Sequence, residues 1–154
     1  MRQIFATAVM GTLALTGSPV LQPSELSLGG VAVGATEQNA LEHLGQPVSR
    51  TDNEEGIDLR YRDLVVSIGW LDDLAPGTPR RVYEIIGTGK TACTPRGLCP
   101  GMTAEAAFKL YGATEPVRRE TGPFFEYQPD AANCWLRISA PNGVIESLAV
   151  VYQP

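Results

Sequence analysis

Two stretches of the sequence decide the expected fold: residues 30–45 read GVAVGATEQNALEHLG, and residues 97–112 read GLCPGMTAEAAFKLYG. They align without a gap. The identical pairs are Gly30/Gly97, Gly34/Gly101, Thr36/Thr103, Ala40/Ala107 and Gly45/Gly112. Self-similarity of this kind indicates an internal repeat. The last glycine of each stretch is expected to end a helix, because glycine takes the left-handed conformation at little cost.

Each stretch predicts a short helix, over 36–44 and over 103–111. Thr36 and Thr103 are the expected N-caps, whose hydroxyls accept from free backbone amides of the first turn. The third position of the first helix is Asn39 rather than Glu or Gln, so a complete capping box is not expected there. A stripe of apolar residues gives each helix one face to bury.

After each predicted helix the hydrophobic period changes from helical to alternating. Short apolar runs between turn residues predict antiparallel strands. The expected strands cover 57–61, 64–70, 81–86, 123–127, 134–138 and 144–152. The predicted fold class is α+β: two tandem helix-then-antiparallel-meander repeats with the helices on one face of the sheet or sheets. The repeats would cover 26–88 and 96–154, with a connector at 89–95.

The first residues have the plan of a secretory signal peptide. Arg2 precedes the uncharged run IFATAVMGTLAL at residues 4–15, and small residues follow at 16–18. The run is shorter than the ~20 apolar residues that a membrane-spanning helix needs, and no cysteine follows it to carry a lipid. We therefore expect a signal peptide at 1–18 with cleavage between 16 and 25. The mature protein would be periplasmic or secreted, without a membrane span or lipid anchor.

The glycine-threonine-helix-glycine pattern resembles the SmpA/OmlA superfamily of bacterial envelope proteins. Two copies in one exported chain are similar to the tandem form seen in the β-lactamase inhibitor protein. This resemblance implies a non-enzymatic, protein-binding role in envelope assembly or enzyme inhibition. The motifs that carry it are Gly101-Met102-Thr103, Tyr111-Gly112, Arg96-Gly97-Leu98, and the weaker copy Gly34-Ala35-Thr36 with Leu44-Gly45.

The three cysteines are first read as disulfide candidates in an exported chain. Cys93 and Cys99 enclose a short loop with a proline and a glycine, which favours a bond between them; Cys99–Cys134 is the alternative. Cys134 would then be left over in a strand beside Trp135. A reactive thiol needs a nearby base, and the only histidine, His43, falls in the other half of the sequence.

Charge and motifs argue against several other classes of function. The formal net charge of −5, with no basic cluster, makes nucleic acid and anionic membranes poor partners. A phosphate loop ending at 89–91 would need a glycine where Glu84 stands. Acidic residues at 52–55 and 72–73 fit solvated turns better than paired catalytic carboxylates. No catalytic residue, metal site or cofactor is predicted.

Aromatic side chains in the predicted strands are the best binding candidates, since interface hot spots are rich in Trp and Tyr. Packing in the core is their competing role. The candidates are Tyr61, Trp70, Phe125, Tyr127 and Trp135. The leading hypothesis is a non-enzymatic module that binds a protein partner in the cell envelope or inhibits another protein. The alternatives are a small hydrolase and a structural envelope subunit with no separate ligand.

Overall fold

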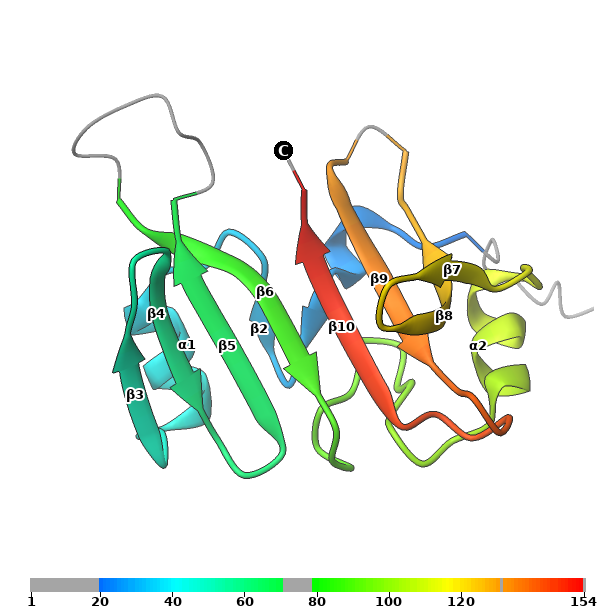
Figure 1. Ribbon diagram of the computed structural model, residues 1–154, viewed down its shortest axis with the longest axis horizontal. Coiled ribbons are helices and arrows are strands. Elements are labelled where there is room, and N and C mark those ends of the chain that lie inside the picture. The colour runs from blue at the N-terminus through cyan, green and yellow to red at the C-terminus, as the bar shows by residue number, and fades with distance from the viewer. Residues whose placement is uncertain (1–19, 71–78, 131, 154) are drawn as a thin grey trace, which may run out of the picture.

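Eight strands form one antiparallel sheet in the order β3-β4-β5-β6-β10-β9-β8-β7 (Figure 1). This computed structural model describes residues 20–70, 79–130 and 132–153. The predicted signal peptide at 1–18 and the acidic turn at 72–73 lie outside these residues. The strands of the sheet are β3 (Ser49–Asp52), β4 (Gly56–Arg60), β5 (Leu64–Gly69), β6 (Arg81–Gly87), β7 (Val117–Arg119), β8 (Gly122–Tyr127), β9 (Cys134–Ser139) and β10 (Ser147–Tyr152).

Shorter elements accompany the sheet. A 3-10 helix, η1 (Pro23–Glu25), leads into a two-stranded sheet made of β1 (Ser27–Leu28) and β2 (Val31–Ala32). The α-helices of the described residues are α1 (Glu37–Leu44) and α2 (Ala104–Tyr111), each of eight residues.

The α+β prediction of two helix-then-meander repeats is wrong, because the fold is mostly β. One eight-stranded antiparallel sheet dominates the described residues, and a two-stranded sheet adds to it, while these residues contain only two α-helices, both short. The sheet is continuous because β6 and β10 pair along four residues, from Leu148↔Gly87 to Val151↔Glu84. The sequence correctly places both helices, but they make up only a small part of the structure.

The helix ends follow the local signals, with two differences. Gly45 and Gly112 end the helices with φ of 76° and 95°. Asn39 completes a capping box after all: its backbone N–H donates to the Thr36 hydroxyl at 3.1 Å, and its side-chain Oδ1 accepts from the Thr36 N–H at 3.3 Å. At α2 the Thr103 side chain makes no cap bond. The free amide of Ala104 donates instead to the carbonyl of Gly143 at 2.9 Å.

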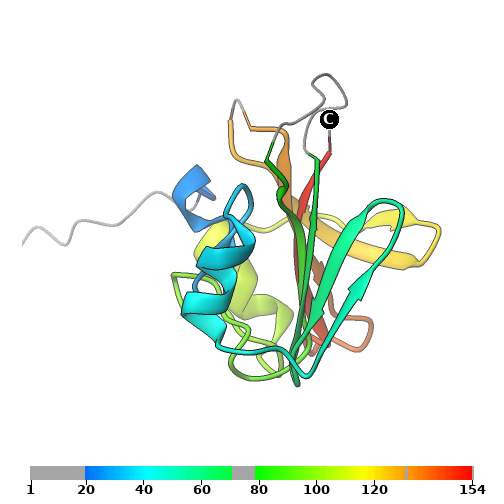
Figure 2. The same ribbon diagram turned by 90° about the vertical axis from the view of Figure 1, so that its left-hand side faces the viewer.

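Both helices lie on the same side of the sheet (Figure 2). Along the central strands every second side chain points to that side and is fully buried, as alternation requires. The small residues Ala40 and Ala107 are also 0% exposed, which lets each helix approach the strands closely. The sheet residues of this core with no exposed area are Leu59, Val66, Ile68, Val82, Ile85, Leu136, Ile138, Leu148 and Val150.

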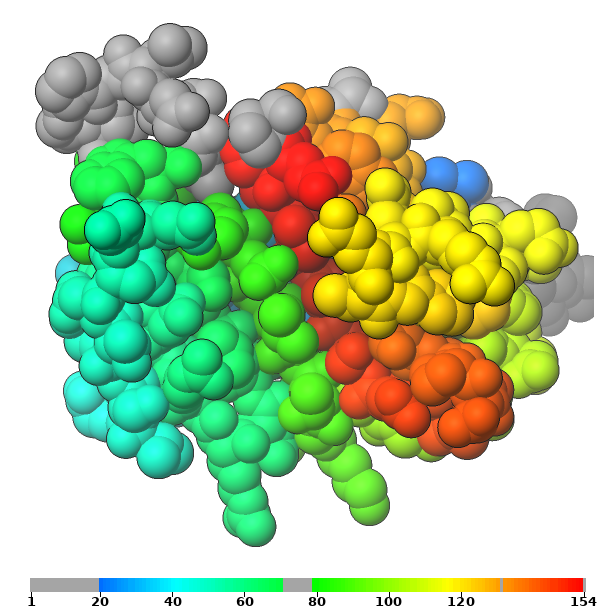
Figure 3. Space-filling model, in the orientation of Figure 1, coloured from blue at the N-terminus to red at the C-terminus, as the bar shows by residue number. Residues whose placement is uncertain are grey.

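No element of the described residues covers the opposite side of the sheet, which we call the open face. Figure 2 shows the outer strands, β3–β4 at one end and β7–β8 at the other, leaning toward this side and away from the helices. Figure 3 looks onto the open face, where residues of the β7–β8 hairpin stand forward of β6 and β10. The open face is therefore a shallow trough floored by the central strands.

Candidate functional site

Three of the predicted binding aromatics point toward the helices. The Tyr61 hydroxyl donates to the carbonyl of Gly45, the residue that ends α1, at 3.0 Å. The Tyr127 hydroxyl donates in the same way to the carbonyl of Gly112, after α2, at 2.7 Å. Tyr127 is 8% exposed, and burial raises its pKa to about 12. These rings tie the helix ends to the sheet.

Phe125 also points to the helix side of the sheet. Its ring meets that of Phe108, on α2, edge to face with centroids 5.0 Å apart. Such pairs favour packing beyond the area they bury. The ring of Phe125 is therefore used within the molecule.

The two tryptophans lie differently. Trp70 follows β5 and is 45% exposed, and the guanidinium carbon of Arg80 lies 4.6 Å from its ring centroid. Trp135 lies in β9 next to Leu136, which is fully buried on the helix side. Because side chains alternate along a strand, Trp135 points to the open face, where it is half-exposed. Trp135 is thus the predicted aromatic that lines the open face.

Strand registers arrange the open-face side chains in two rows across the sheet. Side chains directly opposite on neighbouring strands are close enough to interact. The first row runs Asp58, Ser67, Glu84, Val151, Trp135. The second runs Arg60, Val65, Ile86, Ala149, Arg137, Glu126. The second row is apolar or small in its middle and charged at its ends. The first row carries its carboxylates at Asp58 and, in the centre, at Glu84, and continues with apolar Val151 and Trp135.

A β-bulge places two consecutive side chains of β6 on the open face. The register of β5 and β6 shifts after Ser67, which pairs with Glu84, so that Ile68 pairs with Val82. Val82 and Ile85 are both fully buried although they are three positions apart. The intervening Tyr83 and Glu84 therefore both face the open side, as in a bulge with one extra residue.

The first row contains two carboxylates on either side of one serine. The Ser67 hydroxyl donates to Oδ1 of Asp58 at 2.7 Å. Glu84 is half-buried, and its carboxylate forms no hydrogen bond or ion pair within the described residues. Burial raises the pKa of Glu84; Arg137 opposes this shift, and the charge of Asp58 adds to it. Burial and the negative charge of Asp58 therefore both disfavour a negative charge at Glu84.

At the other end of the trough a carboxylate is well satisfied. Nε and Nη2 of Arg119 donate to the two oxygens of Glu126 at 2.9 and 2.6 Å. Nε of Arg137 lies 3.0 Å from Oε1 of Glu126, though without an aligned hydrogen bond. The Arg119 hydrogen bonds, helped by Arg137, hold the pKa of Glu126 below its usual value against the effect of burial. Arg137 and Arg119 are thus both engaged by Glu126.

The predicted disulfide between Cys93 and Cys99 is present, with the sulfurs 2.04 Å apart. Its loop is tied to two neighbours: Gly29 donates to the carbonyl of Cys93 at 3.1 Å, and the hydroxyls of Thr94 and Tyr111 lie 2.8 Å apart. The bond therefore fixes the approach to α2 against β1–β2 and the end of α2.

Two potential catalytic groups of the sequence, Cys134 and His43, lie apart in the structure. Cys134 is a free thiol on β9, and burial raises its pKa, which is the opposite of what a nucleophile needs. His43 lies on α1, and its Nδ1 is 2.9 Å from the carbonyl of Asn39. Figure 1 shows α1 and β9 at opposite ends of the sheet, so no Cys134–His43 pair forms. Among the described residues, no group of three or more His, Cys, Asp or Glu could hold a metal ion.

A cavity of about 290 Å³ opens where α1, the start of β5 and the segment after β6 meet. The aromatic ring at this cavity is that of Tyr61, whose hydroxyl is already bonded to Gly45. The cavity wall combines aliphatic and charged residues: Gly29, Leu44, Arg62, Asp63, Leu64, Thr91 and Ala92. None of its charged groups is paired across the cavity as an acid and base.

Comparisons with known proteins give a fold likeness and no family. No family model and no curated protein matches the chain. The chain is similar to an extracellular protein containing an SCP domain from Bacillus anthracis str. Ames, with 11% identity and a TM-score of 0.53. That match covers 95% of this chain and 50% of the other, so the chain spans half the length of this neighbour.

A second similar structure is a DUF4309 family protein (YjgB) from Bacillus subtilis subsp. subtilis str. 168, with 12% identity and a TM-score of 0.46. The match covers 77% of this chain and 78% of that one. At such identities, likeness concerns the fold alone. In the described part of the chain, no helix has the length and apolar character needed to cross a membrane.

Proposed function

We propose that this chain is an exported, non-enzymatic binding protein that holds a protein partner on the open face of its sheet. The open face is the observation that supports this most directly. One side of the sheet is covered by helices, while the other carries half-exposed Trp135, Tyr83, Val65 and Ile86 beside charged groups. A sheet face that mixes aromatic, aliphatic and charged side chains is suited to a protein interface.

Export is supported separately from binding. The Cys93–Cys99 bond fits an oxidising compartment, where disulfides form and persist. The signal-like composition of residues 1–18 agrees with this. The resemblance to the SmpA/OmlA superfamily, which implies a protein-binding role in the envelope, points to the same class of function.

Site-specific photocrosslinking in the producing cell tests the proposal. A photoreactive benzoylphenylalanine would replace Ile86, which lies near the middle of the open face, or Val65, its partner on β5. The matched control is Val48, which lies before β3 and is 82% exposed. We expect a discrete protein adduct from positions 86 and 65 and none from position 48. Equal adducts at all three positions, or none at 86 and 65, would refute an interface on the open face.

A further inference from the structure

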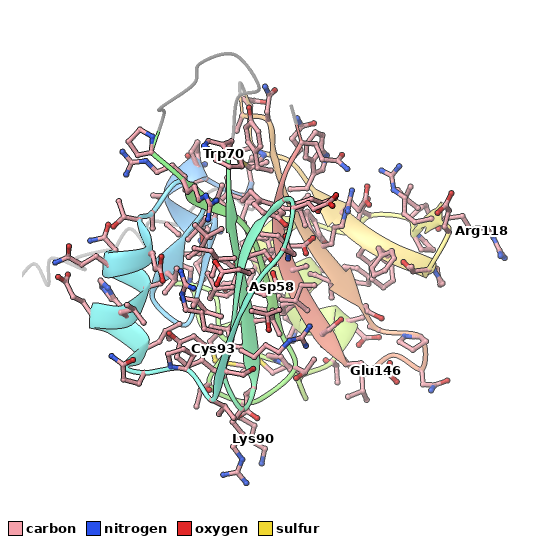
Figure 4. All side chains as sticks on the ribbon, turned by 60° about the vertical axis from the view of Figure 1, so that its left-hand side comes forward. Asp58, Trp70, Lys90, Cys93, Arg118 and Glu146 are labelled. Atoms are coloured by element: carbon pink, nitrogen blue, oxygen red, sulfur yellow. A yellow bond between two sulfur atoms is a disulfide. The ribbon has the colours of Figure 1, made fainter. Side chains whose placement is uncertain are left out.

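The open face holds a carboxylate, Glu84, that forms no ion pair or hydrogen bond within the described residues, although the charge of Arg137 reaches it. Glu84 and Asp58 lie on the strands on either side of Ser67, whose side chain bonds to Asp58 and to Tyr83 and forms no hydrogen bond with Glu84 within the described residues. Figure 4 shows Asp58 about midway along the strands, between the levels of Trp70 and Lys90. A half-buried carboxylate without a partner costs free energy in the isolated protein. Retaining Glu84 there is explained if a partner supplies the missing charge.

Two bases of the open face, Arg137 and Arg60, form no ion pair with these carboxylates within the described residues. Arg137, whose charge reaches Glu84, is bound to Glu126, which also binds Arg119 in bidentate fashion. Arg60, in the neighbouring row, is exposed and forms no ion pair with Asp58 or Glu84 within the described residues. Rearranging Arg137 toward Glu84 would leave Glu126 with one base fewer. The acidic end of the trough is therefore open to a base from outside.

The surroundings of Glu84 indicate what kind of basic group would fit beside it. The bulge turns Tyr83, the residue before Glu84, to the open face, where its ring lies over Gly69 and its hydroxyl bonds to Ser67. Trp135 lies further along the row of Glu84, across buried Val151. Aromatic rings attract cations over their faces, and the aliphatic stem of a long basic side chain packs on apolar surface. Carboxylates, aromatic rings and an apolar floor together suit a lysine or arginine side chain of a protein loop better than a compact inorganic cation.

We infer that the partner on the open face is a protein segment that places an arginine or lysine side chain over Glu84 and Asp58, with its stem on Val151 and Ile86. The inference rests on the proposed function and names the chemistry of its partner. Charge complementarity supports this inference. The part of the trough that holds Asp58 and Glu84 would accept the base, while the part that holds Arg119 and Arg137 favours an acidic or neutral part of the partner. The net charge of −5 adds long-range attraction for a basic segment.

The simplest probe of this inference is a single arginine or lysine residue with its termini blocked. We would titrate the ¹⁵N-labelled protein with N-acetyl-arginine amide and N-acetyl-lysine amide, with N-acetyl-glutamine amide as the neutral control. Amide shifts are expected around Asp58, Ser67 and Glu84 with both cationic probes and not with the neutral one. Shifts spread evenly over exposed acidic residues, or equal shifts with the neutral probe, would overturn the inference.

Variants then locate the charge. Glu84→Gln and Asp58→Asn keep side-chain size, and each is expected to weaken binding of the arginine probe by about fivefold. Glu42→Gln, an exposed acid on α1 on the far side of the sheet, is the matched control and should leave the affinity unchanged. Undiminished affinity in both open-face variants would exclude the acidic pair as the binding site. Well-dispersed amide signals in the spectrum of each variant verify that it is folded. Glu84→Gln and Asp58→Asn are tested separately, so that if one variant misfolds, the other still tests the inference.

The crosslinking experiment separates the two proposals. If benzoylphenylalanine at position 86 still gives its adduct in the combined D58N and E84Q background with full yield, the open face binds a protein without using this pair, and only the present inference falls. If the arginine probe binds as expected and no adduct forms, the cation site stands and the proposed function falls.

Discussion

The two faces of the sheet are built from the same strands and do different work. On β5, Val66 is fully buried toward the helices, while its neighbour Val65 is half-exposed on the open face. On β9, Leu136 is sealed in the core, and Arg137 on the other side binds a carboxylate. One face gains stability from close packing of aliphatic groups, and the other keeps charged groups at some cost. Strand alternation thus separates the side chains that stabilise the core from those that remain accessible for the proposed partner.

Val66→Ala and Val65→Ala compare the two faces most directly, because the same chemical change is made one residue apart. We expect Val66→Ala to lower the free energy of unfolding by about 2 kcal/mol, from lost transfer energy and the cavity left behind. Val65→Ala should cost less than about 1 kcal/mol, since solvent reaches its site. Urea denaturation monitored by fluorescence measures both. Equal losses would mean that the open face is covered in solution.

The ion pairs of Glu126 are the part of the open face that we expect to stabilise the fold. Glu126→Gln removes the charge that binds Arg119 and Arg137, and we expect a loss of about 1 kcal/mol at neutral pH, because the ion pairs are partly exposed. The folded state lowers the pKa of Glu126, so its stabilisation is present above the pKa of the unfolded chain. It is lost as the pH falls through the lower, folded-state pKa.

The measurement is the difference in stability between wild type and Glu126→Gln as a function of pH. That difference should shrink as the solution is acidified below the ordinary range of glutamate. A Glu115→Gln variant, which changes an exposed acid before β7, should show no such trend. A constant difference between wild type and Glu126→Gln at all pH values would assign the effect to packing instead of charge.

Local signals in the sequence located the central parts of the fold. Apolar alternation marks β4, β5, β6, β8, β9 and β10, and the glycines at 45 and 112 mark the helix ends. The edge strands β3 and β7 were missed because all their residues are exposed and show no alternation. The fold class was wrong because two clear helix signals outweighed the strands, while the pairing of β6 with β10 connects residues far apart in the chain.

The positions of the candidate binding aromatics were predictable only in part. Residue type singled them out, but it could not tell that Trp135 faces the open side while Tyr61, Phe125 and Tyr127 face the helices. A binding role for these aromatics stays a prediction. The acidic pair escaped notice because Asp58 and Glu84 meet only through the registers of three strands. Strict alternation from Val82 would also turn Glu84 into the core, and the bulge that prevents this has no clear local signature.

The smallest expected effect concerns Glu84, and its sign is opposite to that of Glu126. The folded state raises the pKa of Glu84, chiefly through burial. Its charged form therefore penalises folding above the folded-state pKa, and the penalty disappears below the pKa of the unfolded chain. Glu84→Gln should raise the free energy of unfolding at neutral pH by less than about 1 kcal/mol.

A gain in stability joined to a loss of arginine binding would identify Glu84 as a residue kept for recognition at the expense of the isolated fold. Thermal denaturation at neutral and at acidic pH measures the first part: the gain should be present at neutral pH and absent in acid, where wild-type Glu84 is already protonated. Ser67→Ala is the useful control, since it removes the hydroxyl that bonds to Asp58 and leaves Glu84 charged. If Glu84→Gln instead destabilises the protein at neutral pH, the carboxylate makes a favourable contact in solution, and the open face has no uncompensated charge to offer a partner.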